Sequence, residues 1–540
     1  MYIIGKGGRR TYLYGTESIH TLAHNKRVKE IEIPHSVTEI GRCEFKGCIN
    51  LKKVLLPDSL ETIEKNAFEG CTSLEEIEIP SSVTSIGCHA FEGCINLKKV
   101  LLPVTLETIG CNAFEGCTSL EEIEIPSSVT SIGYHAFKGC INLKKILLPD
   151  SLVATIEGNE FNGCTALPVI DNIRYADKCL TEIIDKTLPT YTIRNSTKWI
   201  ACNAFSNCSA LEEIEIPSSV TGIGCHAFNG CVNLKKILLP DSLKFISRHA
   251  FEGCTSLEEI EIPDSVTEIG WGAFEGCINL KKILLPDSVE NIGCNAFSGC
   301  FNLVDLKIPS KVHEIDQGLC CRCIKLLNVS LPNNLKVIQS DAFSGCENLR
   351  FVNIPDSVEF IGSNAFKNCE SLKSINIPDG ITQINECAFQ GCEKLATVTF
   401  PSKKFHIGSN AFKQTKNLNL SSKLQIIHKY IGNRINFLTI LGRILGWIFV
   451  GLVLFLVAFV GINIPLILLS WFGDANMSDI YTWLLFAFED SPWASAVIIL
   501  ALLCGGYMVL SFLFFVIGRP IYYLISLFRH LKRYHGIRIR

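Results

Sequence analysis

The chain is poor in charge and has no excess of basic residues. Charged residues make up 19% of its 540 residues, and the formal net charge is −3. Residues 1–420 carry 49 acidic and 40 basic side chains, which gives this part a net charge of −9. Nucleic-acid binding needs a basic face that neutralises phosphates. The composition therefore argues against a nucleic-acid partner.

Signatures of catalysis and of secretion are also missing. The sequence contains no P-loop, no G-x-S-x-G and no H-E-x-x-H. Its first residues, Met1 to Lys6, do not lead into the apolar run and small-residue cleavage site of a signal peptide. We therefore expect no enzyme, no cofactor, no small-molecule substrate and no secretory signal.

What the sequence has in abundance is a repeat of 23 residues. Phe68-Glu69-Gly70-Cys71 returns as Phe91-Glu92-Gly93-Cys94 and then as Phe114-Glu115-Gly116-Cys117. A fixed period of this size indicates a solenoid, in which no single coil can bury its apolar face alone. Function is then expected on repeated surface positions.

Each repeat predicts one short strand followed by a sharp stop. Ile77 and Ile79 alternate with Glu76 and Glu78, which is the pattern of a strand with one buried face. Pro80 ends the strand because proline has no N–H to donate, and fifteen of the 20 prolines occupy this position. A phenylalanine also recurs once per repeat and predicts a stack of rings, with a packing fault where Cys320 replaces it.

These residues resemble the BspA-type leucine-rich repeat family, whose units have the form C-x-x-L-x-x-I-x-I-P-x-x-V-x-x-I-G-x-x-A-F-x-G. The resemblance covers residues 24–415. It implies a parallel β-solenoid that binds other macromolecules, usually proteins. We expect a cap over 1–23 and about 16–17 coils over 24–420. Segment 165–201 is an irregular repeat that could carry a hairpin.

The outward strand positions form a ladder of candidate binding residues. We count from the first leucine of each strand phrase, so that Leu74 is position 1. Position 3 alternates in charge from coil to coil, and position 5 alternates between leucine and glutamate. The candidate face comprises Lys53, Leu55, Glu76, Glu78, Lys99, Leu101, Glu122, Glu124, Lys145, Leu147, Glu213, Glu215, Lys236, Leu238, Glu259, Glu261, Lys282 and Leu284.

Three interpretations of this ladder stay open. The position 3 charges could pair across neighbouring strands, which lie about 4.8 Å apart, and so help to set the register. The leucines at position 5 could form an interaction surface for a protein partner. Recent duplication of a 46-residue pair of repeats would also copy leucine and glutamate without any role in binding.

The 26 cysteines do not indicate a disulfide framework. Fifteen of them recur at one repeat position, where stacked side chains run parallel and do not point at each other. We expect free thiols and a reducing compartment. The residue equivalent to His89 is Asn or His in many coils, which favours a turn of positive φ over a metal ligand. Cys320, Cys321 and Cys323 lack a second ligand pair, so no metal site is predicted.

The C-terminal part predicts a membrane hairpin. Segments 444–472 and 492–518 contain no charged residue, and about 20 apolar residues span a bilayer. Basic residues lie in the juxtamembrane linker 421–443 and in the tail 519–540, whereas the loop 473–491 has only acidic charges. The positive-inside rule therefore predicts two spans, with the repeats and both termini in the cytoplasm.

The leading hypothesis is thus a membrane-anchored scaffold that binds protein partners through its exposed strand face. The alternative is a surface adhesin or receptor with the repeats outside the cell, which the family resemblance would favour. A small transporter or channel regulated by the solenoid is less favoured, because neither span contains Asp, Glu, Lys, Arg or His.

Overall fold

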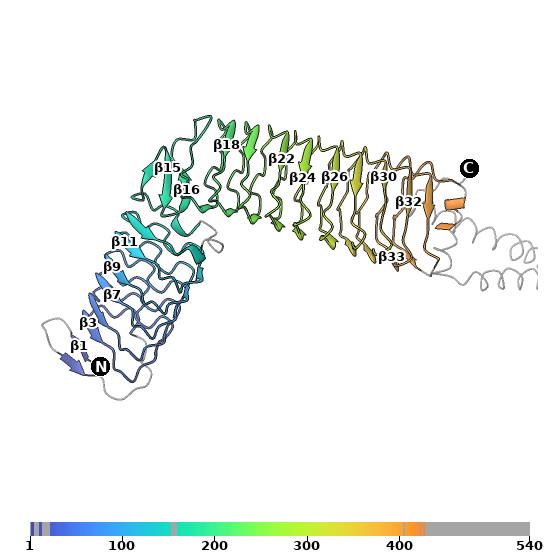
Figure 1. Cartoon of the computed structure of the whole chain (residues 1–540). Coiled ribbons are helices and arrows are strands. Elements are labelled where there is room, and N and C mark those ends of the chain that lie inside the picture. The colour runs from blue at the N-terminus through green and yellow to red at the C-terminus, as the bar shows by residue number, and fades with distance from the viewer. Residues whose placement is uncertain are drawn as a thin grey trace, which may run out of the picture.

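The computed structural model describes residues 22–152, 159–402, 405–419, 421–423 and 425–426, together with the backbone of 2–4 and 10–12. The described residues form a rod of stacked coils with a bend between a shorter N-terminal arm and a longer C-terminal arm (Figure 1). The predicted parallel β-solenoid of leucine-rich-repeat type is confirmed, with about 16 turns.

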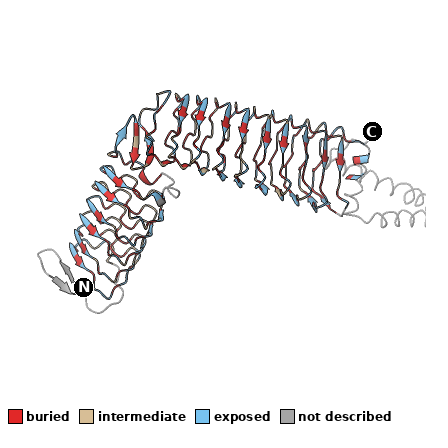
Figure 2. Ribbon diagram, in the orientation of Figure 1, coloured by how far each residue is buried: buried red, intermediate tan, exposed pale blue. Residues whose placement is uncertain are grey.

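The first strand of each coil is the predicted one. Its central residue is buried and both flanking residues are exposed, as the alternation of the sequence requires (Figure 2). These strands are β3 (Glu30–Glu32), β5 (Lys53–Leu55), β7 (Glu76–Glu78), β9 (Lys99–Leu101), β11 (Glu122–Glu124), β13 (Lys145–Leu147), β18 (Glu213–Glu215), β20 (Lys236–Leu238), β22 (Glu259–Glu261), β24 (Lys282–Leu284), β26 (Asp305–Lys307), β28 (Asn328–Ser330), β30 (Phe351–Val352), β32 (Ser374–Asn376) and β34 (Thr397–Thr399).

A second, two-residue strand follows in each coil and was not predicted. It ends on an isoleucine, which a glycine follows in most of these coils. These strands are β4 (Glu39–Ile40), β6 (Thr62–Ile63), β8 (Ser85–Ile86), β10 (Thr108–Ile109), β12 (Ser131–Ile132), β17 (Trp199–Ile200), β19 (Gly222–Ile223), β21 (Phe245–Ile246), β23 (Glu268–Ile269), β25 (Asn291–Ile292), β27 (Glu314–Ile315), β29 (Val337–Ile338), β31 (Phe360–Ile361), β33 (Gln383–Ile384) and β35 (His406–Ile407). They form longer parallel ladders, such as β12-β10-β8-β6-β4.

The 46-residue period of the sequence is visible in the pairing of the first strands of the coils. β7 pairs in parallel with β9, and β11 with β13, but each of these pairs is a separate two-stranded sheet. β18 with β20 and β22 with β24 repeat the arrangement in the longer arm. In each of these sheets, a strand that begins with glutamate pairs with the following strand that begins with lysine.

The irregular segment lies at the bend. Two short 3-10 helices, η1 (Asp150–Leu152) and η2 (Asn159–Phe161), end the shorter arm. The hairpin suggested by the sequence is present: β15 (Ile173–Ala176) and β16 (Cys179–Ile183) are antiparallel, and β14 (Val169–Ile170) pairs with β15. Because β16 then pairs in parallel with β17, the hairpin starts the second-strand ladder of the longer arm.

The N-terminal edge of the first sheet is extended by another antiparallel pair. β1 (Tyr2–Ile4) lies between β2 (Arg10–Tyr12) and β3, and it is antiparallel to both. The order of this sheet is β2-β1-β3-β5. The edge strand of the first coil is therefore paired, which removes a site of strand addition.

The predicted phenylalanine stack forms the centre of the rod. The rings of Phe68, Phe91 and Phe114 lie above one another, with successive centroids 5.3 Å apart and planes within 4° of parallel. All three side chains are fully buried. Stacking stops at Phe297 and resumes at Phe343, on either side of the coil in which Cys320 replaces phenylalanine.

A ladder of buried thiols runs beside the rings. The Sγ of Cys71 donates to the carbonyl oxygen of Phe45 in the preceding coil at 3.1 Å, and Cys94 does the same to Phe68 at 3.2 Å. Burial raises the pKa of Cys94 to about 12, so this thiol is protonated and unreactive at neutral pH. In the described part of the chain no disulfide joins any of the 25 cysteines.

The turn before each phenylalanine has the left-handed conformation that the sequence predicted. Asn66 and His89 have φ of 62° and 59°, and Asn112 has φ of 56°. The glycine ahead of this turn is required by close packing of successive coils. A Cβ on Gly110 would lie 2.5 Å from the backbone nitrogen of Cys88.

Among the described residues, no helix combines the length and the apolar character that a membrane span needs. The predicted spans 444–472 and 492–518 lie outside these residues, as do the loop 473–491 and the tail 519–540.

Candidate protein-interaction face

The structure places all eighteen candidate residues on the surface. Each is an outer residue of a three-residue strand whose middle residue is buried. The leucines at position 5 keep large exposed fractions, which range from 39% at Leu147 to 48% at Leu238. The predicted strand phase is therefore confirmed, and the leucines belong to the outside of the rod.

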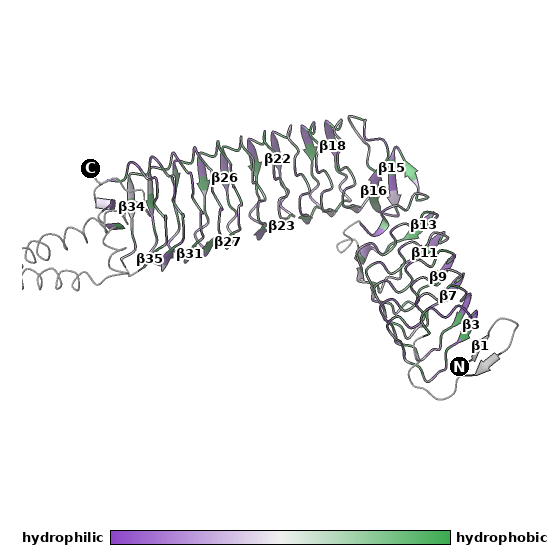
Figure 3. Cartoon of the chain, turned by 180° about the vertical axis from the view of Figure 1, so that it is seen from behind, coloured by the Kyte–Doolittle hydropathy of each residue, from purple (hydrophilic) through white to green (hydrophobic). Residues whose placement is uncertain are grey.

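Leucine and glutamate alternate along this face. In the parallel register Glu78 lies beside Leu101, and Glu124 lies beside Leu147. The longer arm repeats the pairing with Glu215 beside Leu238. Seen from behind, the strands show this mixture of hydrophobic and hydrophilic residues along both arms (Figure 3). Because the exposed leucines lie on alternate coils, equivalent methyl groups are separated by roughly 9–10 Å.

The predicted charge pairing at position 3 was wrong in its position. In the part of the chain that the structure describes, cross-coil ion pairs of this region join position 2 side chains. Lys144 Nζ lies 2.9 Å from Glu121, and Lys235 Nζ lies 2.8 Å from Glu212. Lys281 and Glu258 make the same pair at 2.7 Å. All are well exposed, so each stabilises the fold by at most about 1 kcal/mol.

The charged side chains at position 3 consequently remain available for contacts with another molecule. Glu122 and Lys145 face each other in the strand register. Within the described residues, however, no salt bridge within 4.0 Å joins them. Their side chains remain exposed. A partner could therefore bind them without first breaking an ion pair.

A second exposed apolar column was missed by the sequence reasoning. The residue after the repeat cysteine is half-exposed and apolar in the same coils that carry the position 5 leucine, for example Ile95 at 44% and Ile141 at 46%. The turn that leads into the strand presents these side chains. The signal was present in the sequence, because isoleucine or valine alternates there with threonine or serine. The column comprises Ile49, Ile95, Ile141, Val232 and Ile278, and Phe301 extends it into the next coil, which has Lys307 at position 5.

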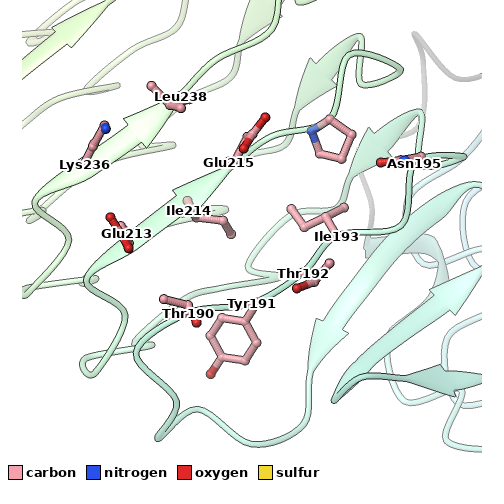
Figure 4. Close-up of a pocket in the computed structure, with 11 residues that line it drawn as sticks. Thr190, Tyr191, Thr192, Ile193, Asn195, Glu213, Ile214, Glu215, Lys236 and Leu238 are labelled. Carbon is pink, nitrogen blue, oxygen red and sulfur yellow. The ribbon is translucent and has the colours of Figure 1, made fainter.

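The face is hollowed next to the bend. A cavity of about 520 Å³ is open to solvent and is lined by two groups of residues (Figure 4). One group consists of candidate residues of β18 and β20: Glu213, Glu215, Lys236 and Leu238. The other comes from the irregular repeat and includes Thr190, Tyr191, Thr192, Ile193 and Asn195.

The hollow arises because the irregular repeat presents short side chains where other coils present charge. Thr190 and Thr192 occupy the positions of Glu76 and Glu78, two residues apart and on either side of Tyr191. Tyr191 is buried and its hydroxyl donates to the carbonyl of Asp185 at 2.5 Å. Burial raises the pKa of Tyr191 to about 12, so it stays neutral and acts as a wall of the cavity.

The ladder changes character in the last coils. Position 5 becomes Lys307 and then Ser330, so the leucine column ends at Leu284. The apolar and charged face therefore covers the shorter arm and the first half of the longer arm, on both sides of the bend.

Comparison with known families gives one strong match. Residues 19–114, 85–187, 178–303, 244–373 and 313–439 match the profile described as BspA type leucine rich repeat region. Together these segments cover well over half of the chain. Among curated proteins, no significant match to this sequence was found.

Several solved bacterial structures are similar. A leucine-rich repeat protein from Bacteroides ovatus has 25% identity over 78% of this chain and 95% of its own, with a TM-score of 0.35. A leucine-rich cell surface protein from Faecalibacterium prausnitzii has 30% identity over 51% of this chain and 78% of its own, with a TM-score of 0.27. The pneumococcal vaccine antigen PcpA has 25% identity over 64% of this chain and 77% of its own, with a TM-score of 0.28.

Proposed function

Because the chain belongs to the BspA-type leucine-rich repeat family, we propose that it is a scaffold whose exposed strand face binds a protein partner. The observation that carries the proposal is the row of outward leucines. Their exposed fractions of 39–48% recur at one position of a rigid repeat. Large apolar side chains held outward at regular intervals favour an interaction surface, and the position 3 charges beside them would supply specificity.

The duplication of 46 residues alone would also produce the row, so the test must detect contact. A photo-crosslinking amino acid at position 101 of the full chain should capture a protein partner. The same group at position 104 is the matched control, because Val104 lies in the turn of the same coil and is 80% exposed. Equal capture at both positions, or capture only at 104, would contradict binding through the strand face.

We further propose that the scaffold is anchored in a membrane by segments 444–472 and 492–518. This proposal rests on the sequence, in which both runs lack charge and the basic residues flank them on the outer sides. By the positive-inside rule, the same asymmetry predicts that the solenoid and both termini lie in the cytoplasm. The lack of disulfides among the described cysteines supports that placement, since disulfides rarely persist in a reducing compartment.

Thiol labelling separates this arrangement from a surface adhesin or receptor. Seven cysteines are partly exposed: Cys43, Cys88, Cys111, Cys225, Cys294, Cys321 and Cys387. A membrane-impermeant maleimide should leave them unlabelled on intact cells and label them after permeabilisation. Strong labelling of intact cells would place the repeats outside and favour the adhesin. Labelling in denaturant, which exposes all thiols, gives the total for comparison.

A further inference from the structure

Two histidines on successive coils break the regular pattern of the turn residues. In the shorter arm this left-handed position alternates between asparagine and histidine: Asn66, His89, Asn112 and His135. In the longer arm, His226 is followed by His249, with φ of 54° at both. No other two successive coils of the described chain carry histidine here. Copying the Asn–His alternation of the shorter arm would place asparagine, not histidine, at position 249.

The two imidazole rings converge on one carboxylate. The rings stack with centroids 4.8 Å apart and planes 3° from parallel. Nδ1 of His249 lies 3.0 Å from Oε2 of Glu252, and Nδ1 of His226 lies 3.7 Å from the same oxygen. The ligand atoms of these three residues all lie within 4.8 Å of one another.

Neighbouring residues hold the cluster in this arrangement. Asn229 lies three residues after His226, just as Glu252 lies three residues after His249. The side-chain amide of Asn229 donates to Oε2 of Glu252 at 2.9 Å. Gly272 leaves room for the ring, because a Cβ there would lie 2.5 Å from Nδ1 of His249. Such outer contacts are what orients the ligands of metal sites.

The histidines face a cavity of about 270 Å³ at the bend. Tyr134 and Asn159 from the end of the shorter arm line it, together with Trp271 of the longer arm. The charged side chain of Arg248 also lines it and opposes a bound cation. The carboxylates of Glu252 and Glu275 would attract a bound cation. Oε2 of Glu275 lies 3.9 Å from Nδ1 of His249.

We propose that His226, His249 and Glu252 form a binding site for a divalent transition-metal ion of the zinc class. Imidazole nitrogen suits zinc, cobalt, nickel and copper, whereas magnesium and calcium take oxygen ligands. Three protein ligands leave one position of a tetrahedral ion for water or another group. Ion–nitrogen distances are about 2.0–2.1 Å, so binding requires rotation of the His226 side chain, which is 41% exposed. This site is independent of the proposed protein-binding face.

Cobalt(II) titration of the full chain tests the site, because its absorption spectrum distinguishes nitrogen and oxygen ligands from thiolates. His226→Asn and His249→Asn should each weaken cobalt binding by at least about tenfold, as even loss of an outer contact does. Asparagine already occupies this turn in other coils, so both variants should fold. Wild-type protein should also melt at a higher temperature with cobalt than without it.

His89→Asn is the matched control. His89 occupies the equivalent turn and lies 2.5 Å from Glu92, but its neighbours are asparagines. This variant should bind cobalt as the wild type does. Glu252→Gln, which keeps the side-chain shape, provides the same comparison should a histidine variant fail to fold. Binding unchanged in all three ligand variants, no binding by the wild type, or a sulfur-to-cobalt absorption band abolished by Cys225→Ser would each overturn the proposal.

Discussion

Phe114→Ala is expected to destabilise the solenoid by about 3–5 kcal/mol. The Phe114 ring is fully buried, and its centroid lies 5.3 Å from the rings of both Phe91 and Phe137. Truncation removes both stacking contacts and leaves a space that the flanking rings cannot fill without moving their coils. Denaturant unfolding of the variant and the wild type measures the loss.

The damage should be local because each coil contacts only its neighbours. Amide hydrogen exchange should accelerate first in β9, β11 and β13, while the coils beyond Phe343 stay protected. This distant region is a useful reference, since the ring stack is already interrupted between Phe297 and Phe343. A loss below about 1 kcal/mol would place Phe114 outside the core and would be incompatible with a stacked spine.

Leu101→Lys combined with Leu147→Lys is expected to abolish capture of the protein partner. A charge at each of two exposed apolar contacts would be desolvated on binding, and loss of a hot-spot residue at the centre of an interface costs about 2 kcal/mol or more. Lysine is preferable to glutamate here, because Glu78 lies beside Leu101 and Glu124 beside Leu147 in the strand register. The new charges therefore meet opposite ones in the free protein.

The fold itself should tolerate these changes. Both leucines are about two-fifths exposed, and surface substitutions of this kind usually change stability by no more than about 0.5 kcal/mol. Val104→Lys, in the turn of the same coil, should leave capture intact and serves as the control. If the double variant captured the partner as strongly as the wild type, the leucines would not take part in binding, and the leucine row would be a by-product of duplication.

The sequence predicts the first strand and the core of each coil because both depend on short-range alternation. Ile77 between two glutamates can only be buried with both neighbours exposed, and this is what the structure has. The left-handed turn at Asn66 and His89 was equally predictable, since few other residues adopt positive φ at low cost. In the candidate face, the same alternation correctly placed all eighteen residues outside.

Other features depend on neighbouring coils and left no comparable pattern within one repeat. The second strand has two residues, such as Ser85–Ile86, which is too short for a period to be recognised. The ion pairs join position 2 side chains such as Lys144 and Glu121, and a single repeat does not distinguish this position from position 3, which carries the same residue types. The cavity beside Thr190 and Thr192 depends on how the irregular repeat packs at the bend.

The histidine pair illustrates the same limit. His226 and His249 are 23 residues apart, and each alone is an ordinary turn residue. Only stacking of the two coils brings their nitrogens to one oxygen of Glu252. Comparing a repeat with its successor, and not only with the consensus, would have revealed the two adjacent histidines.

The central claim is that the phenylalanines form the inside of the rod and the position 5 leucines its outside. Parallel denaturant unfolding of Phe114→Ala and of the Leu101→Lys, Leu147→Lys double variant tests it most directly. The account predicts a loss of about 3–5 kcal/mol for the first and no more than about 1 kcal/mol for the second. The reverse order of stability would mean that the strands present the opposite face to the core, and it would contradict the proposed binding face as well.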